Sequence, residues 1–81
     1  MSPAQAVEAE EEENYIEVPL SECEGKIALE FAYLYPPGSP VIVPGERISK
    51  EAVELLAYYK AQEFQIEGLA EQGKIKVLDH E

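Results

Sequence analysis

The stretch IALEFAYLYPPGSPVIVPGE, residues 27–46, contains the strongest structural signals in the chain. Its first nine residues, Ile27 to Tyr35, are rich in aliphatic and aromatic side chains and predict a β-strand. Pro37-Gly38 and Pro44-Gly45 each suit the central positions of a type II turn. We therefore expect two proline-glycine turns on either side of a short buried strand, Val41 to Val43.

The expected strand at 27–35 has two faces, because successive side chains point to opposite sides of a sheet. One face carries the larger side chains and the other carries the smaller ones together with one carboxylate. The first face consists of Ile27, Leu29, Phe31, Tyr33 and Tyr35, and the second of Ala28, Glu30, Ala32 and Leu34. We expect the first face to pack on the main helix, which leaves the second free to meet a partner domain.

The main helix is expected over residues 49–62, where Ser49 is the N-cap and an apolar stripe recurs at helical spacing. That stripe is Ala52, Leu55, Leu56 and Tyr59. A short helix over 2–13 begins with the capping pair Ser2 and Gln5 and is expected to fray by Glu11. With short strands at 15–18, 64–66 and 74–78, the fold class is α+β with four or five short strands.

Acidic residues dominate the composition. The 81 residues include 17 acidic and 6 basic side chains, which give a net charge of −11. Five of the acids lie in residues 1–14, which have no base, so we divide the chain into an acidic helix or linker at 1–14 and a domain at 15–81. This charge argues against binding to nucleic-acid phosphates or to an anionic membrane surface.

Cysteine content and hydropathy suggest a location. Cys23 is the only cysteine, so an internal disulfide is impossible, as is usual in a reducing compartment. The best apolar run, Ile27 to Tyr35, is interrupted by Glu30 and is shorter than the roughly 20 residues that span a bilayer. The N-terminus has no basic and apolar regions typical of a signal peptide, so we expect a cytoplasmic protein.

Catalytic groups are scarce. The single histidine, His80, stands next to the C-terminus, and three adjacent donors at 79–81 do not fix a metal geometry, so we expect no metal site. The thiolate of Cys23 is disfavoured beside Glu22 and Glu24, so this thiol is expected to be inert. No glycine-rich phosphate-binding motif is present.

The motif Tyr35-Pro36-Pro37-Gly38-Ser39-Pro40, three apolar residues and then Pro44-Gly45-Glu46 resembles the C-terminal domain of the ornithine/lysine/arginine decarboxylases, fold-type I enzymes that depend on pyridoxal phosphate (PLP). That family has Y-P-P-G-I-P, so Ser39 is a departure. The stretches Val18 to Glu30 and Ser2 to Ala6 resemble the family too, and the likeness covers essentially the whole chain.

The resemblance implies α-decarboxylation of arginine, lysine or ornithine on the way to polyamines, with PLP as electron sink. In the family the aldimine lysine follows a histidine in a preceding domain, whereas no lysine follows a histidine here. The chain itself is therefore expected to hold no cofactor and no catalytic residue. It would cover the active-site entrance and support assembly, with the PLP-binding large domain, oligomer partners and the basic substrate as its partners.

Two residues are candidates for the substrate entrance, Glu30 and Tyr35. The motif residues are interpreted as turn formers rather than ligands, and Glu46 is expected to bond the backbone of its own turn; they are Pro36, Pro37, Gly38, Pro40, Pro44, Gly45 and Glu46. The alternative function is a stand-alone acidic interaction module that kept this fold without enzymatic activity.

Overall fold

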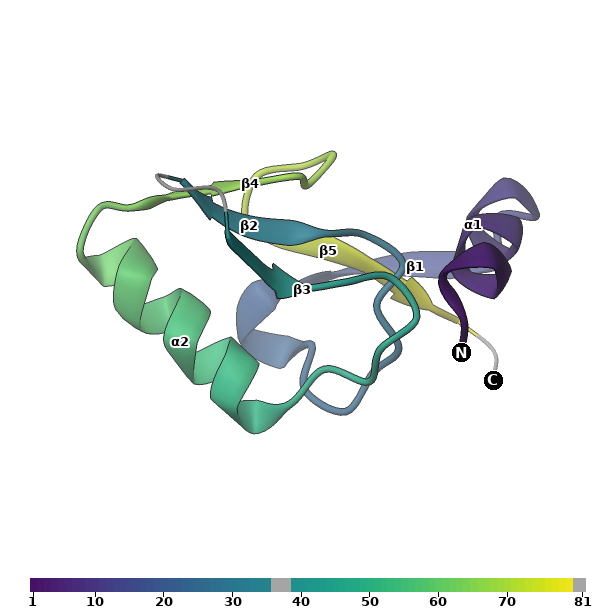
Figure 1. Ribbon diagram of the computed structural model, residues 1–81, viewed down its shortest axis with the longest axis horizontal. Coiled ribbons are helices and arrows are strands. Elements are labelled where there is room, and N and C mark those ends of the chain that lie inside the picture. Colours follow the sequence, from purple (N-terminus) through teal and green to yellow (C-terminus); the bar gives the residue numbers. More distant parts are fainter. Residues whose placement is uncertain (36–38, 80–81) are drawn as a thin grey trace.

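The computed structural model describes residues 1–35 and 39–79, and the side chains at 35 and 39 are outside this description. In this part of the chain, five strands form two small antiparallel sheets, and two helices and one short 3₁₀ turn accompany them (Figure 1). Strands β1 (Tyr15–Pro19) and β5 (Lys74–Leu78) form one sheet. The other has the order β3-β2-β4, with β2 at Ala32–Tyr35, β3 at Ser39–Ile42 and β4 at Gln65–Glu67. The α+β class expected from the sequence is confirmed.

The main helix α2 spans Lys50–Ala61 and is capped as expected, because the Ser49 hydroxyl accepts a hydrogen bond from the backbone N–H of Ala52 at 3.1 Å. Its buried side carries Leu56, flanked by the partly buried Ala52 and Tyr59. Leu55 is 41% exposed, so its assignment to the buried stripe was wrong.

The N-terminal helix α1 spans Pro3–Glu11 and has the full capping box. The Ser2 hydroxyl accepts from the N–H of Gln5, and the Gln5 side chain accepts from the N–H of Ser2. Ala6 and Ala9 are buried against Leu29, at the end of the molecule where the N-terminus and the last residues of β5 lie (Figure 1). Helix α1 therefore packs on the rest of the described fold.

The core lies between the two sheets, α2 and the 3₁₀ turn η1 (Leu20–Glu22). Ile75 and Val77 of β5 are fully buried, as their alternation predicted. Ala32 and Leu34 of β2 point into the same cluster as Leu56. From Ala32 onward the face that was expected to be free therefore packs on the core, and the expected orientation was wrong there. Ile27 and Leu29, in the first part of the segment, are buried as expected.

The segment expected as one strand, 27–35, is divided between the two sheets. Ile27 and Ala28 make isolated bridges to Arg47 and to Val77 of β5, and the regular strand β2 begins only at Ala32. Strands β3 and β4 also differ by one or two residues at their ends from the expected 41–43 and 64–66.

No helix in the described part of the chain is long and apolar enough to cross a membrane.

Candidate functional site

The carboxylate of Glu30 lies where the chain leaves one sheet for the other. Only 9% of the residue is exposed. Its Oε1 accepts the backbone N–H of Lys76 at 2.7 Å, and its Oε2 accepts the N–H of Ala70 at 2.9 Å. Each of these bonds joins segments at least 40 residues apart in sequence. The expectation that Glu30 stands on a free strand face was wrong, because both of its oxygens are occupied by backbone donors.

The second motif turn, at Pro44-Gly45, is hydrogen-bonded to the segment just before Glu30. Gly45 has φ +94°, and the N–H of Glu46 donates to the carbonyl of Val43 at 3.3 Å, as a type II turn over Pro44-Gly45 requires. The Glu46 carboxylate accepts the N–H of Val43 at 3.1 Å, so its predicted bond to its own turn is confirmed. Gly45 and Ala28 are also joined, by an N–H to carbonyl bond of 2.8 Å.

The remaining motif residues are described only in part. Pro36, Pro37 and Gly38 lie outside the described residues, so the first type II turn stays a prediction. Pro40 lies in β3 and is exposed, and the backbone of Tyr35 ends β2 next to that turn. Tyr35 and Glu30 therefore lie on the same stretch of the chain, and the side chain of Tyr35 lies outside the described part.

The outer face of the β3-β2-β4 sheet carries an aromatic pair. The rings of Phe31 and Tyr33 are stacked, with centroids 5.3 Å apart and planes 7° from parallel. Phe31 is 41% exposed, and the register places Pro40 and Glu67 beside Tyr33 on this face. Because Ala32 and Leu34 point to the core, this face is the one turned away from α2. We call these four residues, Phe31, Tyr33, Pro40 and Glu67, the outer sheet face.

Two ionisable groups outside this face, the Cys23 thiol and the Lys76 amine, have raised pKa values. Burial raises the pKa of the Cys23 thiol, which is fully buried, so burial rather than the neighbouring glutamates disfavours its thiolate. The Nζ of Lys76 lies 3.0 Å from the Glu10 carboxylate and 4.8 Å from the centre of the Tyr15 ring. The hydrogen bond with Glu10 raises the pKa of Lys76.

The described residues contain no group of three histidine, cysteine, aspartate or glutamate side chains that could hold a metal ion. No lysine of the sequence follows a histidine, as the aldimine lysine of the family does. Of the two lysines in recorded ion pairs, Lys76 has the less exposed side chain, at 17%, and Glu10 holds its ammonium.

Comparison with known proteins identifies the family. The sequence pattern of "Orn/Lys/Arg decarboxylase, C-terminal domain" matches residues 1–70. The chain belongs to this family. The decarboxylase C-terminal domain is 44% identical over 39 residues to an arginine decarboxylase of Bacillus subtilis, and 44% identical over 41 residues to a lysine decarboxylase of Pseudomonas aeruginosa. These matches cover 48% and 51% of this domain but only 8% and 6% of the two relatives.

Two solved structures resemble the decarboxylase C-terminal domain over nearly all of its length. The constitutive lysine decarboxylase of E. coli matches with a TM-score of 0.75 and 27% identity over 96% of this chain. The lysine decarboxylase of Francisella novicida matches with a TM-score of 0.74 and 33% identity over 95%. The domain spans 13% of each of those chains. The resemblance stated from the Y-P-P-G and P-G-E motifs is thereby confirmed.

The sequence located one part of this site and missed another. It singled out Glu30 and the Pro44-Gly45 turn, and the N–H of Gly45 donates to the carbonyl of Ala28, two residues before Glu30. It assigned Phe31 and Tyr33 to the core, although they form the outer sheet face. The small side chains at 28 and 32 are the signal that could have corrected this, because alanines fit where a strand packs closely in a core.

Proposed function

We propose that this domain covers the active-site entrance of a PLP-dependent decarboxylase of arginine, lysine or ornithine and supports the assembly of that enzyme. Family membership supports the general assignment. The relatives are many times longer than this chain, so a decarboxylase of this kind has ample chain for the separate domain that holds the cofactor. When bound there, PLP supplies the electron sink for loss of the α-carboxylate.

The exposed aromatic pair of the outer sheet face is the observation that supports a contact with that large domain. Aromatic side chains contribute much of the energy of protein interfaces, and the Phe31 ring stacks on that of Tyr33. A preformed aromatic surface loses little side-chain entropy on docking. We therefore assign this face to the large domain, and its edge at Pro40, near the end of β2, to the active-site entrance.

Glu30 contributes to this function by holding three segments of the chain together. Its two bonds hold the segment before β2 against β5 and against the chain between β4 and β5. This fixes the position from which Phe31 and Tyr33 project. A direct contact of Glu30 or Tyr35 with the basic amino acid stays a prediction for the longer enzyme. The polyamine-forming reaction and a cytoplasmic location are parts of the same proposal.

The test uses a decarboxylase of this family from which the matching C-terminal segment has been deleted. The separately produced domain should bind the truncated enzyme and restore decarboxylation. Phe31→Ser should weaken binding by about ten-fold or more, because a central aromatic residue of an interface is worth roughly 2 kcal/mol or more.

Tyr58→Ser is the matched control, because Tyr58 is 60% exposed but belongs to α2, outside the outer sheet face. This variant should bind and restore activity like the wild type. Equal loss in both variants would contradict the assignment of the interface. Absence of any binding by the wild-type domain would favour the stand-alone interaction module instead.

A further inference from the structure

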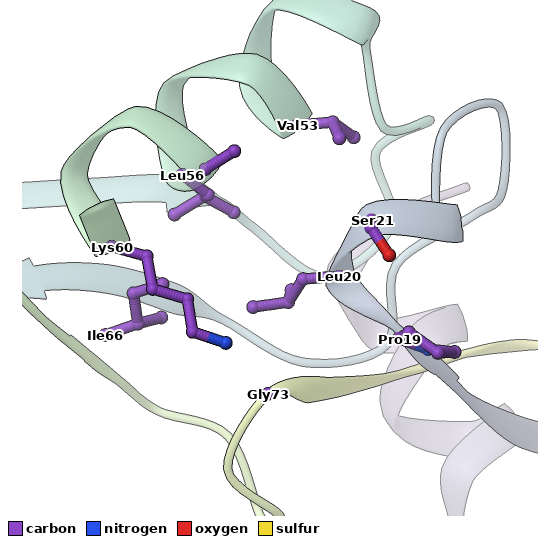
Figure 2. A pocket seen from close by; sticks show the side chains of 9 residues that line it. Pro19, Leu20, Ser21, Val53, Leu56, Lys60, Ile66 and Gly73 are labelled. Carbon is purple, nitrogen blue, oxygen red and sulfur yellow. The ribbon is translucent and has the colours of Figure 1, made fainter.

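A pocket of about 210 Å³ lies between the end of β1, η1, α2, β4 and Gly73, the residue before β5 (Figure 2). Its walls are mostly aliphatic: Leu20 comes from η1, Val53 and Leu56 from α2, and Ile66 from β4. Ligand sites for drug-sized molecules have volumes of roughly 300–1,000 Å³, so this pocket suits a smaller molecule with a single ring or a short branched chain.

One cation lines this pocket. Figure 2 shows the Lys60 side chain extending from α2 past Ile66, with its ammonium pointing toward Gly73. A β-carbon placed on Gly73 would stand 3.9 Å from Nζ, so the ammonium lies close to the first residues of β5. The methylene groups of Lys60 thus extend the apolar wall, while its charge stands at the edge.

The charge of Lys60 is conspicuous in a chain with a net charge of −11. The ion pairs recorded among the described residues join Lys50 to Glu54 and Lys76 to Glu10, and neither involves Lys60. The polar groups of the pocket are this ammonium and, from η1, the hydroxyl of Ser21, which can also donate a hydrogen bond. An apolar cavity with donors at its edge suits an apolar molecule that carries one negative charge.

We propose that this pocket binds a small carboxylic acid with an apolar body. The apolar part lies between Leu20 and Leu56, and the carboxylate pairs with the ammonium of Lys60. This site is distinct from the outer sheet face, and the inference does not depend on the proposed function. The same charge disfavours apolar amines, because they would place a second cation beside Lys60.

The experiment titrates the 81-residue chain with two probes of equal shape and opposite charge, hydrocinnamate and phenylpropylamine, and follows the backbone amide signals by NMR. Hydrocinnamate should shift the signals of Leu20, Val53 and Gly73 with a Kd on the order of a millimolar, as expected for so few atoms. Phenylpropylamine should bind at least about five-fold more weakly. Acetate, which has the charge without the apolar body, should shift none of these signals.

Two variants and one control locate the site. Lys60→Met keeps the apolar stem and removes the charge, so it should weaken hydrocinnamate binding by about two- to five-fold, the range for an exposed ion pair, and abolish the preference over the amine. Lys50→Met, on the exposed side of the same helix, should leave both affinities unchanged. Ala57→Phe places a ring into the pocket from an exposed helix position and should abolish binding.

Equal affinity for the acid and the amine in the wild type would overturn the proposal. So would a preference for the acid that persists in Lys60→Met, since another cation would then be responsible. A preference lost equally in Lys50→Met would show a general effect of charge rather than a pocket.

Discussion

At the scale of single residues, the Glu30 carboxylate replaces a backbone acceptor. The carbonyl of Lys76 accepts the N–H of Leu29 at 2.9 Å, and in a regular antiparallel pair the N–H of Lys76 would donate back to Leu29. It donates to Glu30 Oε1 instead. The chain can therefore turn away from β5 at this point and enter the other sheet without leaving a buried donor unpaired.

Glu30→Gln should lower the free energy of unfolding by about 1–2 kcal/mol, because an amide presents only one oxygen to the two backbone donors. For a domain of this size the melting temperature falls by roughly 4–8 °C per kcal/mol. Circular dichroism melting measures the shift, and Glu67→Gln, an exposed position on the outer sheet face, should show none. Identical curves for Glu30→Gln and wild type would mean that these two bonds add no net stability.

Gly45 allows a second residue-scale test. A β-carbon there would have to adopt φ +94° and would also clash with the carbonyl of Met1 just before α1. Gly25 has a similar φ of +81° with open space around it. Gly25→Ala should cost only the backbone strain, about 1 kcal/mol, and Gly45→Ala clearly more, measured as a larger fall in melting temperature. Equal falls would show that the N-terminal segment moves aside without cost.

At the scale of elements, helix α1 is attached by a small apolar contact and one ion pair. Glu10, 39% exposed in its side chain, pairs with Lys76, which lies over the Tyr15 ring. The remaining glutamates of the acidic run, Glu11 to Glu13, are exposed. The acidic segment at 1–14 therefore includes one glutamate with a structural contact.

Lys76→Met should loosen α1 and speed cleavage after its glutamates by a glutamate-specific protease. We expect an increase of about two- to five-fold, since an ion pair this exposed is worth at most ~1 kcal/mol. Lys74→Met is the control, because Lys74 is exposed at the start of β5. Unchanged cleavage in Lys76→Met would mean that the apolar contact of Ala6 and Ala9 alone holds the helix.

The pH dependence of this contact follows from the raised pKa of Lys76. Folding favours the protonated amine, so the stabilisation is fully present below the ordinary pKa of 10.5 and is lost as the pH rises through the raised value. In the wild type, α1 should therefore become more sensitive to cleavage only above about pH 10.5, and Lys76→Met should lack this transition.

The elements that the sequence predicted well depend on local chemistry. The caps Ser2 and Ser49, the turn at Pro44-Gly45 and the alternation of Ile75 and Val77 all follow from neighbouring residues. The division of residues 27–35 between two sheets did not, because it depends on bonds from Glu30 to residues at least 40 positions away. Once the chain turns at that point, the alternation before it no longer indicates the core face after it.

At the scale of the whole molecule, the isolated chain should bind no PLP and release no carbon dioxide from arginine, lysine or ornithine. The reason is the absence of a lysine preceded by histidine, together with the engagement of Lys76 by Glu10. Absorbance spectroscopy with added PLP and a carbon dioxide assay measure both expectations. An aldimine band stoichiometric with the chain would refute the first.

The pairing of β1 with β5 has a consequence for synthesis on the ribosome. Tyr15 pairs with Leu78, so β1 is synthesised long before the strand with which it pairs. Until β5 leaves the ribosomal exit tunnel, the apolar side of β1 and the future neighbours of Val77 remain uncovered. Closing so long a loop also slows folding. We therefore expect nascent chains that end before residue 74 to be unfolded and to need protection by chaperones.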